Sequence, residues 1–283
     1  MRYREITPSP ALTPYIECFW TLERDATAEQ AEPERILPDG CVELILNFGD
    51  RFRALRDNGS QEDQPNFFMV GQMTKPMLIV PSGGVEIIGI RFHPGGTLPF
   101  FKNPMNELTN EIVEIGALSN SFESELINDV GEFRTLSEKV SRLDELLVSR
   151  ASTRTESSLR LLVNEIVARA GQVTVEELAT TAGISNRQLA RRFLSDVGLT
   201  PKLLCRILRF QQVFRALDRN DAGWSAIALD CGYYDQAHLI RDFQHFAGKA
   251  PALLLAQASP LTRSFTRKDR MSDFSNTTRA ELH

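Results

Sequence analysis

The chain has 283 residues, of which 42% are hydrophobic, and a formal net charge of −5. This length and composition predict two globular domains, and no run approaches the roughly 18 apolar residues of a membrane span, so no membrane partner is expected. The start of the chain lacks the apolar core of a secretory signal, and we expect a cytoplasmic protein. Four scattered cysteines without zinc-like spacing are expected to stay reduced: Cys18, Cys41, Cys205 and Cys231.

The N-terminal third alternates apolar and polar side chains, as half-buried strands do. A turn is expected at Pro81-Ser82-Gly83-Gly84, where it would close a hairpin. Strands are predicted over 42–48, 67–70, 77–80 and 85–92. Together they predict a small β-sheet or partial barrel over about residues 6–92.

Helices are predicted after Pro94, over 122–130 and 136–149. The second helix carries an apolar stripe at steps of four, three and four residues, formed by Leu136, Val140, Leu143 and Leu147. Packing against the sheet of the same chain and pairing in a homodimer are both open for this stripe. The small polar residues that follow predict a linker over 153–159.

Five residues of the N-terminal part are candidates for an effector pocket: Trp20, Asp39, Glu43, Arg91 and His93. Each type has a simpler alternative, because tryptophan is often a core residue, Asp-Gly is often a turn, and Arg with Glu is often a structural ion pair. His93 is the only histidine before His238, so the histidine cluster of a metal-dependent enzyme is missing. Without a phosphate-binding loop or catalytic motif, we expect no cofactor and no enzymatic activity.

The last third contains an internal repeat with a period of fifty residues. The pattern Leu189-x-Arg191-x-Phe193-x4-Gly198-x2-Pro201 returns as Leu239-x-Arg241-x-Phe243-x4-Gly248-x2-Pro251. Each copy follows a short helix that ends in a glycine turn, so each is predicted to form a helix-turn-helix of the kind that reads DNA.

In the first copy, Ser185 and Gln188 have the spacing of a capping box, which opens a helix. Arg187, Ala190 and Arg191 then fall on the outward face of that helix. Arginine suits this position because its planar fork can donate two hydrogen bonds to a guanine edge or grip a phosphate.

In the second copy, Asp235 is the expected cap, and the outward positions are Gln236, Ala237, Ile240 and Arg241. Glutamine can read adenine, and an apolar side chain can meet a thymine methyl group. An ordinary solvated helix face is the alternative for any single side chain. The recurrence of arginine at one outward position of both copies favours DNA reading.

Between the copies, a connector helix is predicted over about residues 202–217. Lys202, Arg206 and Arg209 would suit phosphate contacts, with a solvated basic helix as the alternative. Residues 153–283 carry a net charge of +5 and residues 1–152 a net charge of −10. Positive charge is therefore concentrated where DNA would lie.

From about residue 161 to 255 the chain resembles the DNA-binding domain of AraC/XylS-type transcriptional regulators. The resemblance is carried above all by Ile227-Ala228-x-x-Cys231-Gly232-Tyr233-x-Asp235-x3-Leu239-x-Arg241-x-Phe243-x4-Gly248-x2-Pro251. Tyr233 stands where the family usually has phenylalanine. The resemblance places base reading on the seven outward residues named above for the two copies.

The N-terminal part resembles an uncharacterised domain found ahead of many such regulators, through Leu37-Pro38-Asp39-Gly40-Cys41-x-Glu43-Leu44 and Gly89-x-Arg91-Phe92-x-Pro94-Gly95-Gly96. The resemblances imply an α+β protein with a sensing or dimerisation domain (1–152), a linker (153–159), an all-helical double helix-turn-helix domain (160–258) and a mobile tail (259–283).

They also imply a function: a sequence-specific regulator that binds double-stranded DNA, activates transcription through RNA polymerase and responds to a small-molecule effector. The alternative is a ligand-independent DNA-binding protein whose N-terminal domain only dimerises or binds a protein partner.

Overall fold

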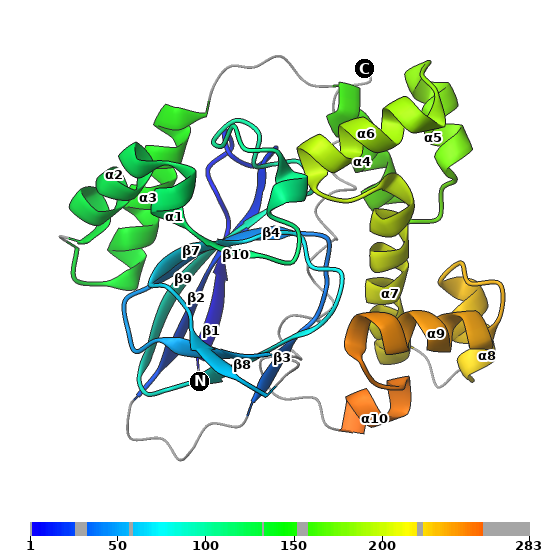
Figure 1. The fold of residues 1–283 in the computed structure, drawn as a ribbon, viewed down its shortest axis with the longest axis horizontal. Coiled ribbons are helices and arrows are strands. Elements are labelled where there is room, and N and C mark those ends of the chain that lie inside the picture. The colour runs from blue at the N-terminus through cyan, green and yellow to red at the C-terminus, as the bar shows by residue number, and fades with distance from the viewer. Residues whose placement is uncertain are drawn as a thin grey trace.

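The structure is a computed structural model that describes residues 2–25, 33–56, 59–131, 133–151, 158–219 and 223–256. The N-terminal part contains strands β1–β10 and helices α1–α3, and the C-terminal part contains helices α4–α10 (Figure 1). This confirms the predicted α+β class. The predicted tail and most of the predicted linker lie outside the described residues. Among the helices that the structure describes, none combines the length and the apolar composition of a membrane-spanning helix.

Six strands form an antiparallel sheet in the order β1-β2-β9-β4-β7-β10. Strand β9 pairs with both β2 and β4, and its register places Arg91 opposite Glu43. The bounds are β1 Arg2–Ile6, β2 Ile16–Arg24, β4 Val42–Asn47, β7 Phe67–Val70, β9 Val85–Phe92 and β10 Ile112–Glu114.

A second, four-stranded sheet has the order β3-β8-β5-β6. The two sheets pack face to face around a buried cluster that includes Trp20, Phe52 and Phe68. The bounds are β3 Glu34–Ile36, β5 Phe52–Leu55, β6 Gln61–Asp63 and β8 Met77–Pro81.

The prediction of a hairpin closed by Pro81-Ser82-Gly83-Gly84 is wrong, because β8 and β9 do not pair with each other. Strand β8 pairs with β3 and β5, whereas β9 pairs with β2 and β4, so this turn carries the chain from one sheet to the other. Alternation of apolar residues identifies a strand and its buried face, but it does not identify the strand's partner.

Helices cover the outer face of the six-stranded sheet. Val140, Leu143 and Leu147 of α3 are buried in one cluster with Leu44 and Ile90 of the sheet. Of the two alternatives for the apolar stripe, packing against the chain's own sheet is therefore the one observed. The bounds are η1 Met105–Glu107, α1 Ile115–Leu118, α2 Asn120–Gly131 and α3 Leu136–Arg150.

The C-terminal part is all-helical, with the predicted connector present as α7. A single hydrophobic cluster joins Phe193 of α6, Phe210 of α7 and Phe243 of α9, so both helix-turn-helix units share one core with the connector. The bounds are α4 Ser158–Ala168, α5 Val175–Ala182, α6 Asn186–Val197, α7 Pro201–Arg219, α8 Trp224–Asp230, α9 Gln236–Ala247 and α10 Pro251–Ala256.

Candidate nucleic-acid interface and ligand cavity

The first helix-turn-helix unit is formed by α5 and α6. Its turn contains Gly183 with a φ of 64°, a left-handed conformation that glycine adopts without strain. The Gln188 side chain then accepts a hydrogen bond of 3.0 Å from the Ser185 backbone N–H, and Ser185 Oγ accepts one from the Gln188 N–H at 3.3 Å. The predicted capping box is confirmed, and it sets where α6 begins.

Helix α6 has one buried face and one basic face. Leu189 and Phe193 are buried, whereas Arg187 and Arg191 are exposed one turn apart and Ala190 is half-buried. The predicted outward face is confirmed by this exposure. Its contact with DNA stays a prediction.

The second unit, α8 and α9, repeats this arrangement with a different cap. Asp235 Oδ1 accepts a hydrogen bond of 2.7 Å from the backbone N–H of His238, as predicted for a cap. Leu239 is buried, while Ala237 and Arg241 are exposed. Arg191 and Arg241 therefore occupy equivalent exposed positions on two capped helices.

Two predicted reading residues of α9 are only partly exposed. Gln236 is half-exposed, and its Oε1 accepts a hydrogen bond of 3.2 Å from Ser225 Oγ of α8. Ile240 packs partly against the shared core. The outward face of α9 is thus dominated by Ala237 and Arg241.

The three predicted phosphate ligands on α7 differ in their surroundings. Lys202 is exposed. Arg206 forms an ion pair of 2.8 Å with Asp242 of α9, whose side chain is 3% exposed. Arg209 Nη1 donates a 3.4 Å hydrogen bond to the carbonyl of Gly171. The guanidinium groups of Arg206 and Arg209 are therefore engaged within the domain, where they link α7 to α9 and to the loop after α4.

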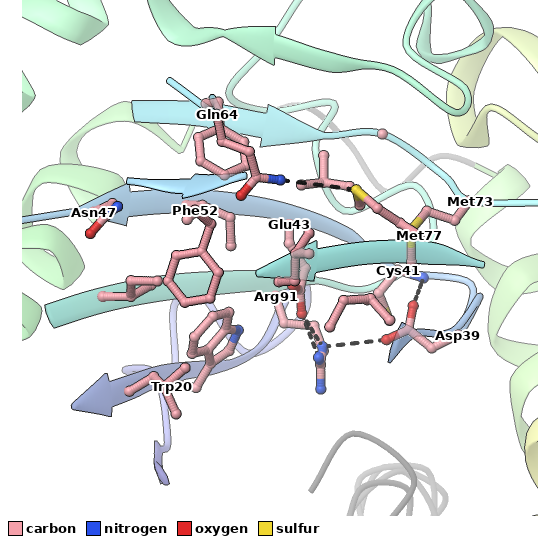
Figure 2. Close-up of a pocket in the computed structure, with 18 of the residues that line it drawn as sticks. Trp20, Asp39, Cys41, Glu43, Asn47, Phe52, Gln64, Met73, Met77 and Arg91 are labelled. Carbon is pink, nitrogen blue, oxygen red and sulfur yellow. Dashed lines mark hydrogen bonds and ion pairs between the residues drawn. The ribbon is translucent and has the colours of Figure 1, made fainter. Parts of the chain in front are cut away.

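A cavity of about 70 Å³ lies between the two sheets of the N-terminal domain (Figure 2). Four of the five predicted pocket residues line it: Trp20, Asp39, Glu43 and Arg91. Most of the remaining wall is apolar, and Figure 2 shows Glu43, Arg91 and Asp39 gathered toward one end. The structure brings these four residues together around one cavity, while ligand binding stays a prediction.

Arg91 is the centre of the polar end. Its side chain is 1% exposed, and its Nε lies 2.7 Å from Glu43 Oε1 and 3.6 Å from Asp39 Oδ2. Burial alone would lower the pKa of Arg91, but the coulombic effects of Glu43 and Asp39 raise it well above its ordinary value. The guanidinium therefore stays charged.

Cys41 lies beside this group on the loop before β4. Its backbone N–H donates a 2.9 Å hydrogen bond to Asp39 Oδ1, and its thiol points to Glu17 Oε2 at 3.5 Å. Burial, followed by the charges of Asp39 and Glu17, raises the pKa of the Cys41 thiol well above its ordinary value. Cys41 is consequently a neutral thiol and a poor nucleophile.

Trp20 reaches the cavity because its neighbour across the sheet is glycine. A Cβ built on Gly89 would lie 1.9 Å from Trp20 Cε2, so the indole occupies the space that any other residue would fill. Gly89 was not among the predicted site residues. Its position two residues before Arg91 in the Gly-x-Arg motif was the signal that could have identified it.

The fifth predicted residue, His93, lies beyond the end of β9 and apart from this cavity. Burial lowers the pKa of His93 to about 4, and a hydrogen bond with the Thr13 backbone raises it by a smaller amount. This histidine is therefore neutral near pH 7. Across the part of the chain that the structure describes, no group of three or more His, Cys, Asp or Glu side chains could hold a metal ion.

Two family models match the chain. Residues 178–257 match a model described as "Helix-turn-helix domain", and residues 4–114 match one described as "Domain of unknown function (DUF6597)". The chain carries an AraC-type helix-turn-helix domain. This AraC-type domain, which contains α6 and α9, identifies a DNA-binding transcription regulator. No curated protein matches the chain.

Solved structures match the chain at low identity and with TM-scores below 0.5. ToxT from Vibrio cholerae is 10% identical with a TM-score of 0.47, over 85% of this chain and 99% of that chain. Unsaturated fatty acid bound ToxT from the same organism is 10% identical with a TM-score of 0.46, over 93% and 100%. The AraC-like transcriptional activator CuxR is 14% identical with a TM-score of 0.25, over 72% and 74%.

Proposed function

We propose that this regulator recognises a specific DNA sequence by inserting α6 and α9 into successive major grooves of one duplex. The observation that carries the proposal is the exposed arginine at equivalent positions of two capped helices, Arg191 and Arg241. The connector α7 has 19 residues, a length of about 28 Å at 1.5 Å per residue. That length is close to the ~34 Å repeat of one DNA turn.

The two helices would select different bases. Arginine reads guanine, glutamine reads adenine, and small or apolar side chains meet thymine methyl groups. The proposed base contacts are Arg187, Ala190 and Arg191 of the first unit and Gln236, Ala237, Ile240 and Arg241 of the second. Lys202 is the leading phosphate contact, while Arg206 and Arg209 add positive charge from within the domain. Because the units differ, one chain is expected to bind a non-palindromic site.

A gel-shift titration tests this docking. The duplex is first selected from random-sequence DNA by the unaltered protein. Arg191→Ala and Arg241→Ala are each expected to weaken binding about 5- to 150-fold, the equivalent of ~1 to 3 kcal/mol for a lost base contact. Arg142→Ala, which removes a half-exposed arginine of α3, is the control outside the helix-turn-helix units and should bind normally. Unchanged affinity of both reading-helix variants would refute the docking.

We further propose that the cavity binds a small effector with an apolar body and a hydrogen-bond-donating or cationic group. The walls supply apolar contacts, and the carboxylates of Asp39 and Glu43 outnumber the single guanidinium of Arg91 at the polar end. A thermal-shift screen of the full chain against small amines and their matching carboxylic acids is the test. An amine that raises the melting temperature of the unaltered protein but not of Trp20→Ala supports the proposal. Shifts produced only by the acids would contradict it.

The proposed regulatory outcome is activation through contact with RNA polymerase. Transcription in vitro from a promoter that carries the selected DNA site, with purified polymerase, reports the sign directly. A rise in transcript that disappears with Arg241→Ala is expected. A fall in transcript would identify a repressor instead.

A further inference from the structure

The loop between β3 and β4, residues 37–41, belongs to two sites at once. Leu37, Asp39 and Cys41 of this loop line the cavity. Leu37 is also 4% exposed within the hydrophobic cluster of the DNA-binding domain. We call residues 37–41 the shared wall, because one side of the loop closes the cavity and the other packs on the helical domain.

The backbone of the shared wall lies directly on α7. The Pro38 carbonyl accepts a buried hydrogen bond of 2.6 Å from Gln211 Nε2. Gly40 has a φ of 85°, and a Cβ at this position would lie 3.1 Å from Leu204 Cδ1 and 3.6 Å from Leu208 Cδ2. The contact is therefore close, and it depends on the loop keeping this conformation.

A second wall segment of the cavity, residues 71–77, reaches the end of the first reading helix. Gln72 is fully buried and donates a 2.7 Å hydrogen bond from Nε2 to the Gly40 carbonyl, which ties this segment to the shared wall. Gln72 also packs beside Gly198, the cap of α6. Thr109 Oγ1 donates a further 2.7 Å hydrogen bond to the Gly198 carbonyl. Both wall segments thus contact the DNA-binding domain.

The cavity is too small for an ordinary metabolite in its present state. Its volume of about 70 Å³ compares with roughly 300–1,000 Å³ for typical ligand pockets. Most of the wall consists of paired strands, which cannot separate without breaking their ladder of hydrogen bonds. Additional space must come from movement of one sheet away from the other or from the connecting segments, and these segments contact α7 and the end of α6.

We propose that the shared wall couples the cavity to the docking of the two domains. A cavity of this small volume accompanies the docked arrangement, and a molecule larger than the cavity pushes the wall away from α7 and loosens the contact with α6. Because coupling is reciprocal, loosening the docking also opens the wall. This inference rests on the proposed effector role of the cavity for its biological meaning, but its test requires neither an effector nor DNA.

The substitution Ile45→Trp tests the coupling by filling the cavity with a covalently attached side chain. Ile45 lies on β4 and lines the cavity, so an indole at this position fills space that a ligand would take. Hydrogen exchange of the full chain, measured by mass spectrometry, should rise about tenfold in residues 37–41 and 198–211. Ile45→Leu conserves volume and is the matched control, with exchange like that of the unaltered protein. A folded Ile45→Trp protein with unchanged exchange in both segments overturns the proposal.

The reverse experiment does not depend on Ile45→Trp folding. Gln211→Ala removes the hydrogen bond to Pro38 and changes no residue that lines the cavity. The half-buried Cys41 thiol should then react several-fold faster with a thiol reagent, whereas Gln212→Ala, one position along α7, should leave the rate unchanged. An unaltered Cys41 rate in Gln211→Ala refutes the coupling.

The two proposals can fail separately. Coupling in both experiments without any thermal shift from small molecules would support the coupling proposal and refute the effector proposal. Thermal shifts in a protein that shows no coupling would support the effector proposal and refute the coupling proposal.

Discussion

Removing Glu43 from the buried ion pair with Arg91 is expected to destabilise the N-terminal domain strongly. Glu43→Ala leaves a guanidinium that is 1% exposed, with the Asp39 carboxylate still 3.6 Å away. Breaking a buried pair from one side costs about 3 to 5 kcal/mol, because the remaining charge has lost its solvation and its partner. The attraction to Asp39 places the expected loss of unfolding free energy at the lower end, about 3 kcal/mol.

A double variant separates the cost of an orphaned charge from the net worth of the pair. Glu43→Leu combined with Arg91→Met removes both charges and fills their space with apolar side chains. The double variant should therefore lose less than about half as much unfolding free energy as Glu43→Ala. Urea unfolding followed by Trp20 fluorescence measures this in a Trp224→Phe background, since the chain has two tryptophans. A loss below about 1 kcal/mol for Glu43→Ala would refute the reasoning.

Gly89→Ala should cost about 1 to 3 kcal/mol in urea unfolding, because the new Cβ would lie 1.9 Å from the Trp20 ring; stability equal to that of the unaltered protein contradicts this. His93 has a folded pKa of about 4 against 6.5 unfolded. Neutral His93 therefore contributes on the order of 3 kcal/mol to the free energy of unfolding above pH 6.5, and this contribution is lost as the pH falls toward 4. His93→Asn should flatten the dependence of unfolding free energy on pH over this range. Arg206→Ala orphans the buried Asp242 carboxylate and should lower the melting temperature by several degrees, unlike the exposed control Arg192→Ala.

The helix-turn-helix units were predictable because their signals are local. Ser185 and Gln188 form their capping box within one turn, and the spacing of Leu189 and Phe193 identifies the buried face. Asp242 shows the limit of this reasoning, since the prediction did not include it. It lies three residues after Leu239, which places it on the inner side of α9, but only the fold shows that Arg206 reaches it.

The cavity and the domain contact depend on partners that are distant in the chain. Gln211 and Pro38 are 173 positions apart, and no periodicity or motif connects them. The same reason explains the wrong hairpin at Pro81-Ser82-Gly83-Gly84, because a turn between two strands does not show which sheet each strand joins. Trp20, Asp39, Glu43 and Arg91 were identified by residue type, while the enclosure that brings them together comes from the packing of two sheets.

The hydrophobic cluster that runs through α6, α7 and α9 makes the C-terminal domain a molecular ruler. Because Phe193, Phe210 and Phe243 share this cluster, neither unit can swivel without exposing aromatic surface. The protein should therefore measure the phase of the double helix as well as its sequence. Five base pairs inserted between the two recognised segments would turn the second groove to the opposite side of the duplex, and binding would be lost even though the sequence of each segment is unchanged.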